Sequence, residues 1–380
     1  MKIRIAIICP YYPWPPSVGG VETIVRSVST ELAKRGHEVY VITTPFDVTM
    51  MKQVVEYGVE ERDGVIIYKL KPEKLKLGYA RFLKNLKKVI REVKPDIVHE
   101  HNLHPHLIQL ALWRSSIKYR LIAELHHPAV NLDFLTQKLA MPFAVLALKL
   151  ISRDVDAFIA HTLIEKNWLR SKGIPDEKIS LIRFPAIPQR LLSIDIRTEM
   201  LGDVLYLGRI VPRKGVHILI KALNIVKQHL SNIKATIAGP AEPGYLKELK
   251  NLTERLNLKN NVMFSGMIKE EEKYALIKSH KVLVLPSLKE YTPGILLEAQ
   301  ALGIPVIATR VGAVPEMLIE NETGLLVQPN NEFELAKAIK TLLSDGITYQ
   351  SFSKKAREFA KNFTVEKAVE NIEKVYYNVL

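Results

Sequence analysis

Short apolar runs of strand length alternate with longer segments of helical periodicity along nearly the whole chain. In the first half these runs occupy residues 3–9, 38–43, 65–70, 96–99, 120–125 and 156–161. A second series begins near residue 203, with runs at residues 203–208, 234–239, 262–265, 282–286, 306–309 and 325–327. Such alternation is typical of parallel sheets covered by helices. The pattern therefore predicts an α/β protein with two Rossmann-like, doubly wound domains.

The two series are separated by a segment that breaks the periodicity. Pro185 and Pro188 follow the first series, and a mixed polar stretch continues to about Gly202. We predict an N-terminal domain over residues 1–190, a C-terminal domain over residues 200–362, and a final helix over residues 363–380. The carboxyl ends of the strands are where such sheets bind ligands, so we expect a cleft between the domains.

One predicted helix is strongly amphipathic and basic. Its apolar stripe consists of Tyr79, Phe82, Leu83, Leu86, Val89, Ile90 and Val93. Residues 69–94 contain ten Lys and Arg against two Asp and Glu. Two interpretations stay open: the stripe packs on the core below a solvated charged face, or the segment docks on an anionic membrane surface.

Composition narrows the class of protein without choosing a function. The chain has 380 residues, 47% of them hydrophobic, and a formal net charge of +14. This charge attracts phosphate, so nucleotides, nucleic acid and anionic lipid all stay open. Cys9 is the single cysteine, which excludes an internal disulfide and zinc-ribbon sites. We find no signal peptide and no apolar window long enough for a membrane span, and therefore expect a cytoplasmic protein.

Two turns after predicted strands have the chemistry of phosphate-binding loops. Gly19 and Gly20 precede a helix, where backbone N–H groups and the helix dipole can receive an anion. Arg209 and Lys214, with Arg213 beside them, belong to the corresponding turn of the second domain. Together they can hold a diphosphate and neutralise it as a leaving group. The simpler interpretations are an ordinary turn and a solvated loop.

The segment after the run at residues 282–286 contains the signals of a short helix. Thr292 suits the N-cap, Pro293 the first helical position and Gly303 the C-terminal stop. We therefore predict a helix over about residues 293–302.

Two carboxylates belong to the same segment. Glu290 precedes the predicted helix and Glu298 lies in its second turn. Both can accept hydrogen bonds from sugar hydroxyls on either side of a bound phosphate. Complementation of the helix dipole explains Glu290 nearly as well.

Histidines gather near the ends of two predicted strands: His99, His101, His104, His106, His126 and His127. Neutral imidazole is a ligand for Zn²⁺ and related metals. Pro105 interrupts the first group, however, and no His-Glu-x-x-His spacing is present, so we predict no metal site. Hydrogen bonding or proton handling at the strand ends is the better interpretation.

Taken together, these segments resemble the retaining glycosyltransferases of family 4, the group 1 enzymes of GT-B fold. The resemblance covers nearly the whole chain and rests on the order and spacing of residues 19–22, 94–99, 208–215, 290–298, 303–308, 311–316 and 323–327. It implies two Rossmann-like domains facing across a cleft, with a C-terminal helix that returns to the first domain.

The resemblance also implies a reaction, in which a hexose passes from a UDP- or GDP-linked donor to a hydroxyl of a glycan or lipid-linked acceptor. Configuration would be retained, without an obligatory metal or other cofactor. Arg209 and Lys214 would hold the diphosphate, Glu298 the ribose and Glu290 the transferring sugar. His126 would lie near that sugar, with His127 as the alternative one position later. The remaining donor contacts would come from Gly19, Gly20, Thr292, Pro293, Gly294 and Ile295.

The chain departs from the family pattern at three places. Where the family usually reads Glu-x-Phe-Gly, Pro293 withdraws a backbone N–H near the donor sugar. His161 and Thr162 replace a serine, and residues 184–187 replace an Asn-Gly-Val-Asp segment. Contacts from residues 161–162 and 184–187 are therefore not carried over.

Other functions stay open beside the leading one. A GT-B synthase with a soluble acceptor, of the sucrose, trehalose or glucan type, fits the same motifs. A basic nucleotide-binding protein without transfer activity explains the charge but not Glu290 and Glu298. We expect no nucleic-acid partner, since no RNA-binding aromatic motif is present, and the missing G-x-G-x-x-G fingerprint disfavours a nicotinamide dehydrogenase. An anionic membrane surface, contacted through residues 69–94, is the additional partner that stays open.

Overall fold

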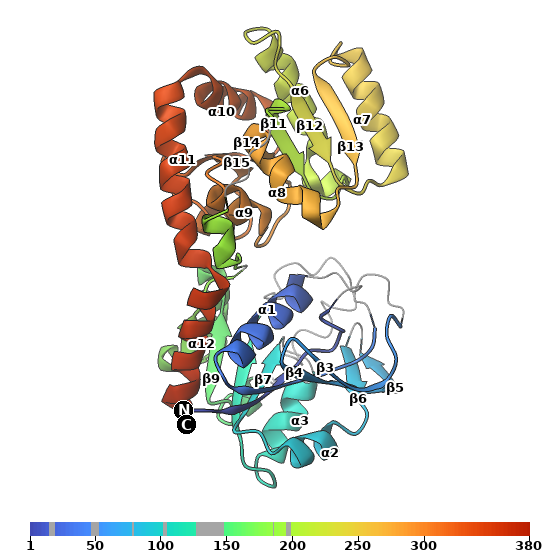
Figure 1. Cartoon of the computed structure of the whole chain (residues 1–380), viewed down its shortest axis with the longest axis vertical. Coiled ribbons are helices and arrows are strands. Elements are labelled where there is room, and N and C mark those ends of the chain that lie inside the picture. The colour runs from blue at the N-terminus through green and yellow to red at the C-terminus, as the bar shows by residue number, and fades with distance from the viewer. Residues whose placement is uncertain are drawn as a thin grey trace. The chain divides into compact units, whose positions relative to one another are not determined.

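The computed structural model describes residues 1–14, 20–46, 53–77, 80–101, 105–126, 148–184, 186–194 and 199–380. The chain divides into two compact units (Figure 1). The first unit consists of Met1–Phe184 and Val365–Leu380, and the second of Pro185–Thr364. Each unit is built around a parallel sheet of its own.

The first unit has, within its described residues, an eight-stranded sheet in the order β10-β9-β8-β7-β1-β2-β4-β3. Its strands are β1 Arg4–Ile8, β2 Glu38–Thr43, β3 Gly58–Arg62, β4 Val65–Lys69, β7 Ile97–His101, β8 Arg120–Glu124, β9 Ala157–Ala160 and β10 Ile179–Leu181. Neighbouring strands are parallel except β3 and β4, which are antiparallel. In the central register, Ile7 lies opposite Val41 and His99.

Helices on both faces of this sheet explain why its central strands are nearly continuous apolar runs. The helices include α1 Gly20–Lys34, α2 Leu86–Val93, α3 Pro105–Trp113, α5 Leu163–Ser171 and α12 Val365–Val379. Successive side chains point to opposite faces. Val98 belongs to the core cluster that contains buried residues of α2 and α3, whereas its neighbour His99 contacts α12.

The basic helix is shorter than the sequence predicts. Part of it forms strand β6 Ala80–Leu83, which pairs with β5 Pro72–Leu77, and α2 begins only at Leu86. Asn85, with a φ of +65°, turns the chain between the strand and the helix. Packing on the core is confirmed for the part of the stripe that is helical, where the buried residues are Leu86, Val89, Ile90 and Val93. Tyr79 lies outside the described residues.

The second unit has, among its described residues, an all-parallel six-stranded sheet in the order β13-β12-β11-β14-β15-β16. The strands are β11 Gly202–Leu207, β12 Ala235–Ala238, β13 Val262–Gly266, β14 His280–Leu285, β15 Val306–Thr309 and β16 Gly324–Val327. The helices include α6 Val216–Lys227, α7 Pro243–Arg255, α8 Glu270–Lys278, α9 Ile295–Ala301, α10 Glu332–Ser344 and α11 Gly346–Ala360. Each apolar run predicted for this half forms one of these strands.

The strand order of the second unit reverses beside β11. From β11 the chain moves outward to β12 and β13, then returns to β14 on the other side of β11 and continues to β15 and β16. The loops that leave β11 and β14 therefore diverge from adjacent strand ends. Such a reversal point is where doubly wound sheets bind ligands. The first unit has the same reversal between β1 and β7.

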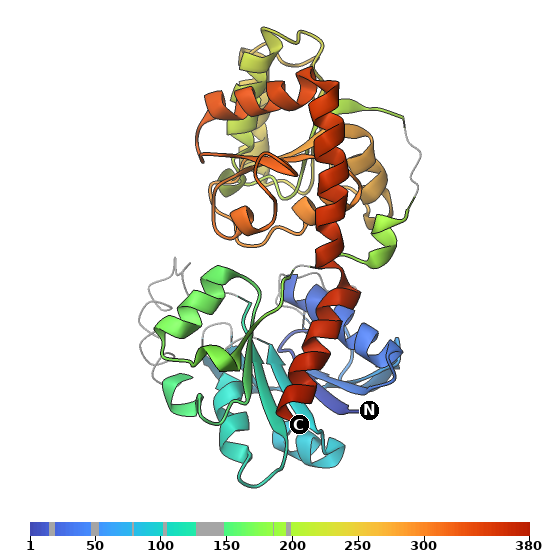
Figure 2. The ribbon, with the colours of Figure 1, turned by 90° about the vertical axis from the view of Figure 1, so that its left-hand side faces the viewer.

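Helix α12 returns to the first unit and packs beside α1, as Figure 2 shows. The Arg35 guanidinium forms an ion pair of 2.9 Å with Glu373, and His37 Nε2 lies 2.8 Å from the same carboxylate. The Tyr376 hydroxyl lies 2.7 Å from His99 Nδ1. The expected return of the C-terminal helix to the first domain is confirmed.

Candidate functional site

The loop after β11 carries the predicted cations of the second unit. It passes through a short 3₁₀ turn at Pro212–Lys214 and enters α6 at Val216. The Arg209 residue is exposed, and its carbonyl accepts a hydrogen bond of 2.7 Å from the Tyr206 hydroxyl. The turn is thus tied to β11 while the Arg209 side chain stays accessible.

This loop is in backbone contact with the loop that leaves β14. The N–H of Leu288 donates to the carbonyl of Arg213 at 2.8 Å. A Cβ atom at Gly215 would lie 2.0 Å from the carbonyl oxygen of Pro286, so only glycine fits there. The two loops therefore have a fixed position relative to each other.

The contact between the loops brings two predicted site residues together. The Lys214 ammonium donates a hydrogen bond to Oε1 of Glu290, and the Ser287 hydroxyl donates to the same oxygen at 3.0 Å. The Lys214 and Glu290 side chains are only 14% and 8% exposed, so solvent screens their interaction weakly. A lysine in this position can exchange its carboxylate partner for a phosphate.

A third loop fixes the backbone around Glu290. The N–H of Ala313 donates to the carbonyl of Tyr291 at 3.1 Å. Gly312 has a φ of +52°, and a Cβ atom there would lie 2.1 Å from the Glu290 carbonyl oxygen. The motif at residues 311–316 contains Gly312, but the sequence alone gives no reason to assign this glycine to the site.

Helix α9 begins later than predicted. Gly294 occupies the N-cap, so Thr292 is not the cap and Pro293 is not the first helical residue. The reason is that the first i→i−4 hydrogen bond runs from the N–H of Glu298 to the Gly294 carbonyl. The predicted end is confirmed, because Gly303 follows the last turn with a φ of +74°.

Glu298 has a cationic partner that sequence reasoning missed. The Lys273 ammonium, from α8, donates to Oε1 of Glu298 at 2.9 Å. Both side chains are 19% exposed. Nothing in the sequence separates Lys273 from the other charged residues of α8, and only the packing of α8 against α9 reveals the contact.

In the first unit, the predicted histidine His126 follows β8 and is buried. Its Nε2 atom lies 2.8 Å from His101 Nδ1 and 2.9 Å from Oε1 of Glu124. Burial lowers the pKa of His126 to about 3, although the Glu124 carboxylate acts in the opposite direction. The ring is therefore neutral near pH 7.

Some predicted residues of the first unit are outside what the structure describes. Gly19, His104 and His127 lie there, whereas Gly20 begins α1. The choice between His126 and His127, and the role of Gly19, therefore stay predictions.

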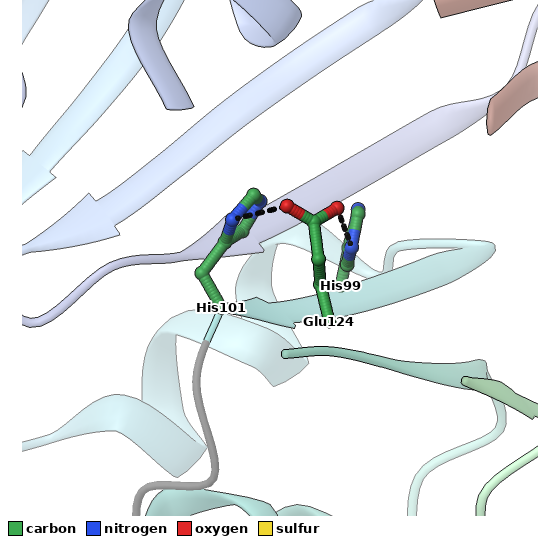
Figure 3. A group of neighbouring side chains, drawn as sticks. All are labelled: His99, His101 and Glu124. Atoms are coloured by element: carbon green, nitrogen blue, oxygen red, sulfur yellow. Dashed lines mark ion pairs between the residues drawn. The ribbon is translucent and has the colours of Figure 1, made fainter. Parts of the chain in front are cut away.

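Glu124 is the centre of a buried cluster. Figure 3 shows its carboxylate between two rings, with His99 Nε2 3.1 Å from Oε2 and His101 Nδ1 3.1 Å from Oε1. His161, after β9, places Nε2 3.2 Å from Oε1. Burial by itself raises the pKa of Glu124, but the surrounding imidazoles, chiefly those of His101 and His161, hold it well below its usual range. Sequence reasoning named His99, His101 and His126, missed Glu124, and noted His161 only as a departure from the family pattern, because side chains from separate strands meet only in the folded sheet.

The basic segment of the first unit exposes several charges. Lys88 and Arg91 are exposed on α2, with exposed Lys84 and Lys94 just outside its two ends. Among the helices in the described part of the chain, none has the length and apolar character needed to cross a membrane.

Two family descriptions match the chain in succession. Residues 18–184 match "Glycosyltransferase Family 4", and residues 197–359 match "Glycosyl transferases group 1". The chain belongs to the family 4, group 1 glycosyltransferases. It is accordingly a glycosyltransferase.

Individual relatives agree with this assignment. N-acetyl-alpha-D-glucosaminyl L-malate synthase of Bacillus anthracis is 25% identical over 395 residues, which cover 100% of this chain and 98% of that protein. D-inositol 3-phosphate glycosyltransferase of Corynebacterium glutamicum is 30% identical over 196 residues, covering 50% of this chain and 46% of that protein.

Solved structures share the fold. Anabaena HepE in complex with UDP has a TM-score of 0.76 at 20% identity, over 100% of both chains. Sucrose-phosphate synthase from Thermosynechococcus elongatus has a TM-score of 0.75 at 21% identity, over 98% of both chains. The predicted GT-B fold class is confirmed.

Proposed function

We propose that the protein is a retaining hexosyltransferase that uses a UDP- or GDP-linked sugar and a hydroxyl of a glycan or glycolipid acceptor. The observation that carries the proposal is the Lys214–Glu290 pair at the reversal point of the second sheet. It combines a phosphate-binding cation with a sugar-binding carboxylate in one place. HepE, solved in complex with UDP and with UDP-glucose, supports a uridine nucleotide as the donor.

The diphosphate of the donor would bind at the turn of residues 208–215. Lys214 and the exposed Arg209 would neutralise the negative charge that grows on the diphosphate as the glycosidic bond breaks. Two cations can supply this stabilisation without a divalent ion at the phosphates. Gly19 and Gly20, before α1, would add backbone N–H groups to the donor site.

The carboxylates would bind the two sugars of the donor. Glu298 would accept the ribose hydroxyls and Glu290 those of the transferring hexose. Residues 292–295 would supply backbone contacts, except that Pro293 offers no N–H. His126, as a neutral ring, would lie near the transferring sugar and could donate one hydrogen bond to it.

Retention follows from attack on the face that the diphosphate leaves. The departing phosphate oxygen would take the proton of the acceptor hydroxyl as that hydroxyl bonds to the anomeric carbon. This route needs no separate nucleophile, and we identify none in the described residues.

A soluble acceptor is the second candidate, and two relatives favour it. They are N-acetyl-alpha-D-glucosaminyl L-malate synthase and D-inositol 3-phosphate glycosyltransferase. A lipid-linked acceptor would instead favour docking of the exposed Lys84, Lys88 and Arg91 on a membrane. Co-sedimentation with anionic vesicles separates the two, because electrostatic docking weakens as the salt concentration rises.

The first experiment is a thermal-shift screen with UDP-, GDP- and ADP-linked hexoses, each with and without EDTA. A ligand at about 100 times its Kd adds about 2.7 kcal/mol of apparent stability. We expect a shift with one nucleotide that survives EDTA and is lost in Arg209→Ala. NMR of the product then reports the anomeric configuration. Folded protein that responds to no nucleotide would contradict the proposal.

A further inference from the structure

The buried cluster of the first unit, which includes His126, has the composition of a metal site. Glu124, His126 and His161 each place one ligand atom within 4.8 Å of the other two, and His101 Nδ1 lies 3.1 Å from the shared Glu124 oxygen. These four residues are at most 5% exposed. We propose that Glu124, His126 and His161 bind one divalent transition-metal ion of the Zn²⁺ type.

The neutral form of His161 does not account for its short contact with Glu124. His161 Nδ1 lies 2.8 Å from the carbonyl oxygen of Ile182, so this nitrogen must carry the ring hydrogen. In a neutral ring, Nε2 then presents a lone pair to the Glu124 oxygen 3.2 Å away. Two lone pairs at this distance repel each other unless a positive charge lies between them.

Other buried atoms of the cluster also lack a hydrogen-bond partner. Both Glu124 oxygens, together with Nε2 of His99 and of His161, are buried and have no aligned hydrogen-bond partner among the described residues. Buried polar atoms are nearly always satisfied. Several unsatisfied polar atoms around one carboxylate indicate a cluster built for a cation.

The ligand atoms of the cluster indicate which kind of cation it binds. Two imidazole nitrogens and one carboxylate oxygen are a ligand set of Zn²⁺ and its neighbours. Bonds of about 2.0–2.1 Å would place the ligand atoms about 3.3 Å apart. The Glu124 oxygen is 2.9 Å from His126 Nε2 and 3.2 Å from His161 Nε2, so only a small expansion is needed.

The surrounding contacts also match those of a metal site. A ligating histidine commonly donates its second N–H to a carbonyl, as His161 does to Ile182. The second oxygen of Glu124 faces His99, whose other nitrogen contacts the Tyr376 hydroxyl of α12 at 2.7 Å. These contacts orient the ring and the carboxylate toward the proposed ion.

A proton is the competing cation. An imidazolium at His161 would pair with Glu124 and neutralise the cluster without a metal. One proton occupies a single nitrogen, whereas a metal ion accepts lone pairs from every ligand at once. Metal content therefore separates the two possibilities.

The proposed ion does not conflict with the role of His126 in sugar transfer. A ring that binds a metal through Nε2 keeps its hydrogen on Nδ1, which remains a donor. The cations that would receive the diphosphate belong to the second unit. Metal binding and nucleotide binding are therefore measured separately.

The test is metal analysis of the full chain, purified without a histidine tag or a chelating resin. We expect about one zinc per chain, and a tetrahedral Co²⁺ absorption spectrum after the zinc is removed and Co²⁺ is added. Tyr376→Phe, which removes the hydroxyl that contacts His99, should lower the metal affinity by about 10- to 100-fold. Glu124→Gln and His161→Ser, which remove proposed ligands, should lower it further. His280→Gln, which removes a buried histidine of the second unit, should keep the metal.

Folded wild-type chain that contains no metal and gives no Co²⁺ spectrum would overturn the proposal in favour of a protonated cluster. If the cluster variants do not fold, the Co²⁺ titration of the wild-type chain decides alone. The nucleotide screen is run on the same protein. A nucleotide shift without metal contradicts only the metal site, and metal without a nucleotide shift contradicts only the sugar-transfer proposal.

Discussion

Lys214 and Glu290, 76 positions apart in the sequence, form an ion pair where the loops leaving β11 and β14 meet. A diphosphate that binds Lys214 must compete with this carboxylate. We expect the phosphate to take the ammonium and the sugar hydroxyls to take the carboxylate. The pair would then couple recognition of the leaving group to recognition of the transferring sugar.

Removing either diphosphate-binding cation should slow transfer. Lys214→Ala and Arg209→Ala should each lower kcat by about 10²-fold or more, since each loses a preorganised charge that stabilises the leaving diphosphate. Steady-state kinetics with the donor found in the nucleotide screen measures this. Lys227→Ala is the matched control, because its ammonium donates to the Asn257 carbonyl at an exposed position outside the proposed site. Unchanged turnover in both site variants would remove the assignment.

Replacing Glu298 should affect nucleotide binding more than turnover. Hydrogen bonds to a charged group are worth about 1.5–3 kcal/mol, so Glu298→Gln should raise the Kd of the nucleoside diphosphate by about 10- to 100-fold. Calorimetry with the nucleotide measures the loss. Inorganic pyrophosphate, which has no ribose, is the control ligand and should bind both proteins equally. An equal loss for pyrophosphate would show that Glu298 acts on the phosphates instead.

The close approach of Gly312 to Glu290 predicts a variant that damages the site through the backbone. A Cβ atom in Gly312→Ala would lie 2.1 Å from the Glu290 carbonyl oxygen, so the loop must move. We expect lower kcat and a stability loss of about 1–3 kcal/mol. Gly346→Ala is the control, because a Cβ there meets nothing within 4 Å. Wild-type turnover in Gly312→Ala would show that the position of Glu290 is not critical.

Much of the fold was predictable because buried parallel strands are nearly continuous apolar runs. Strand β3 was missed for the opposite reason, since four of its five residues are exposed and it carries no apolar run. The basic helix was predicted too long because the residues of β6 continue the apolar spacing of α2. The spacing of apolar residues does not reveal the turn at Asn85 that separates the strand from the helix.

The site was predictable where one loop carries its own signal. Lys214 and Glu290 each follow a strand and each has an evident chemical role. Lys273 and His161 have no such signal, because their importance comes from a partner on another element. Which residues meet across a sheet depends on strand order, and the sequence pattern does not specify that order.

His280, which is not among the proposed site residues, should make the stability of the protein depend on pH. His280 donates from Nδ1 to the Leu276 carbonyl at 2.9 Å and accepts at Nε2 from the Thr236 hydroxyl at 2.8 Å. Burial lowers the pKa of His280, although the Leu276 carbonyl and Asp203 act in the opposite direction. Protonation would cost the hydrogen bond from Thr236. The native state therefore takes up this proton at lower pH than the unfolded chain, whose histidine has a pKa of about 6.5.

The contribution of His280 to stability should be complete above about pH 6.5 and fall as the pH drops below that value. Each proton bound only by the unfolded state lowers the free energy of unfolding by up to about 1.4 kcal/mol per pH unit. Urea denaturation of the full chain between about pH 8 and pH 5 measures the slope. His280→Gln should show a shallower decline than the wild type, whereas the exposed control His229→Gln should match the wild type. Equal slopes for wild type and His280→Gln would mean that protonated His280 is accommodated in the fold, with Thr236 turning its hydroxyl to accept instead of donate.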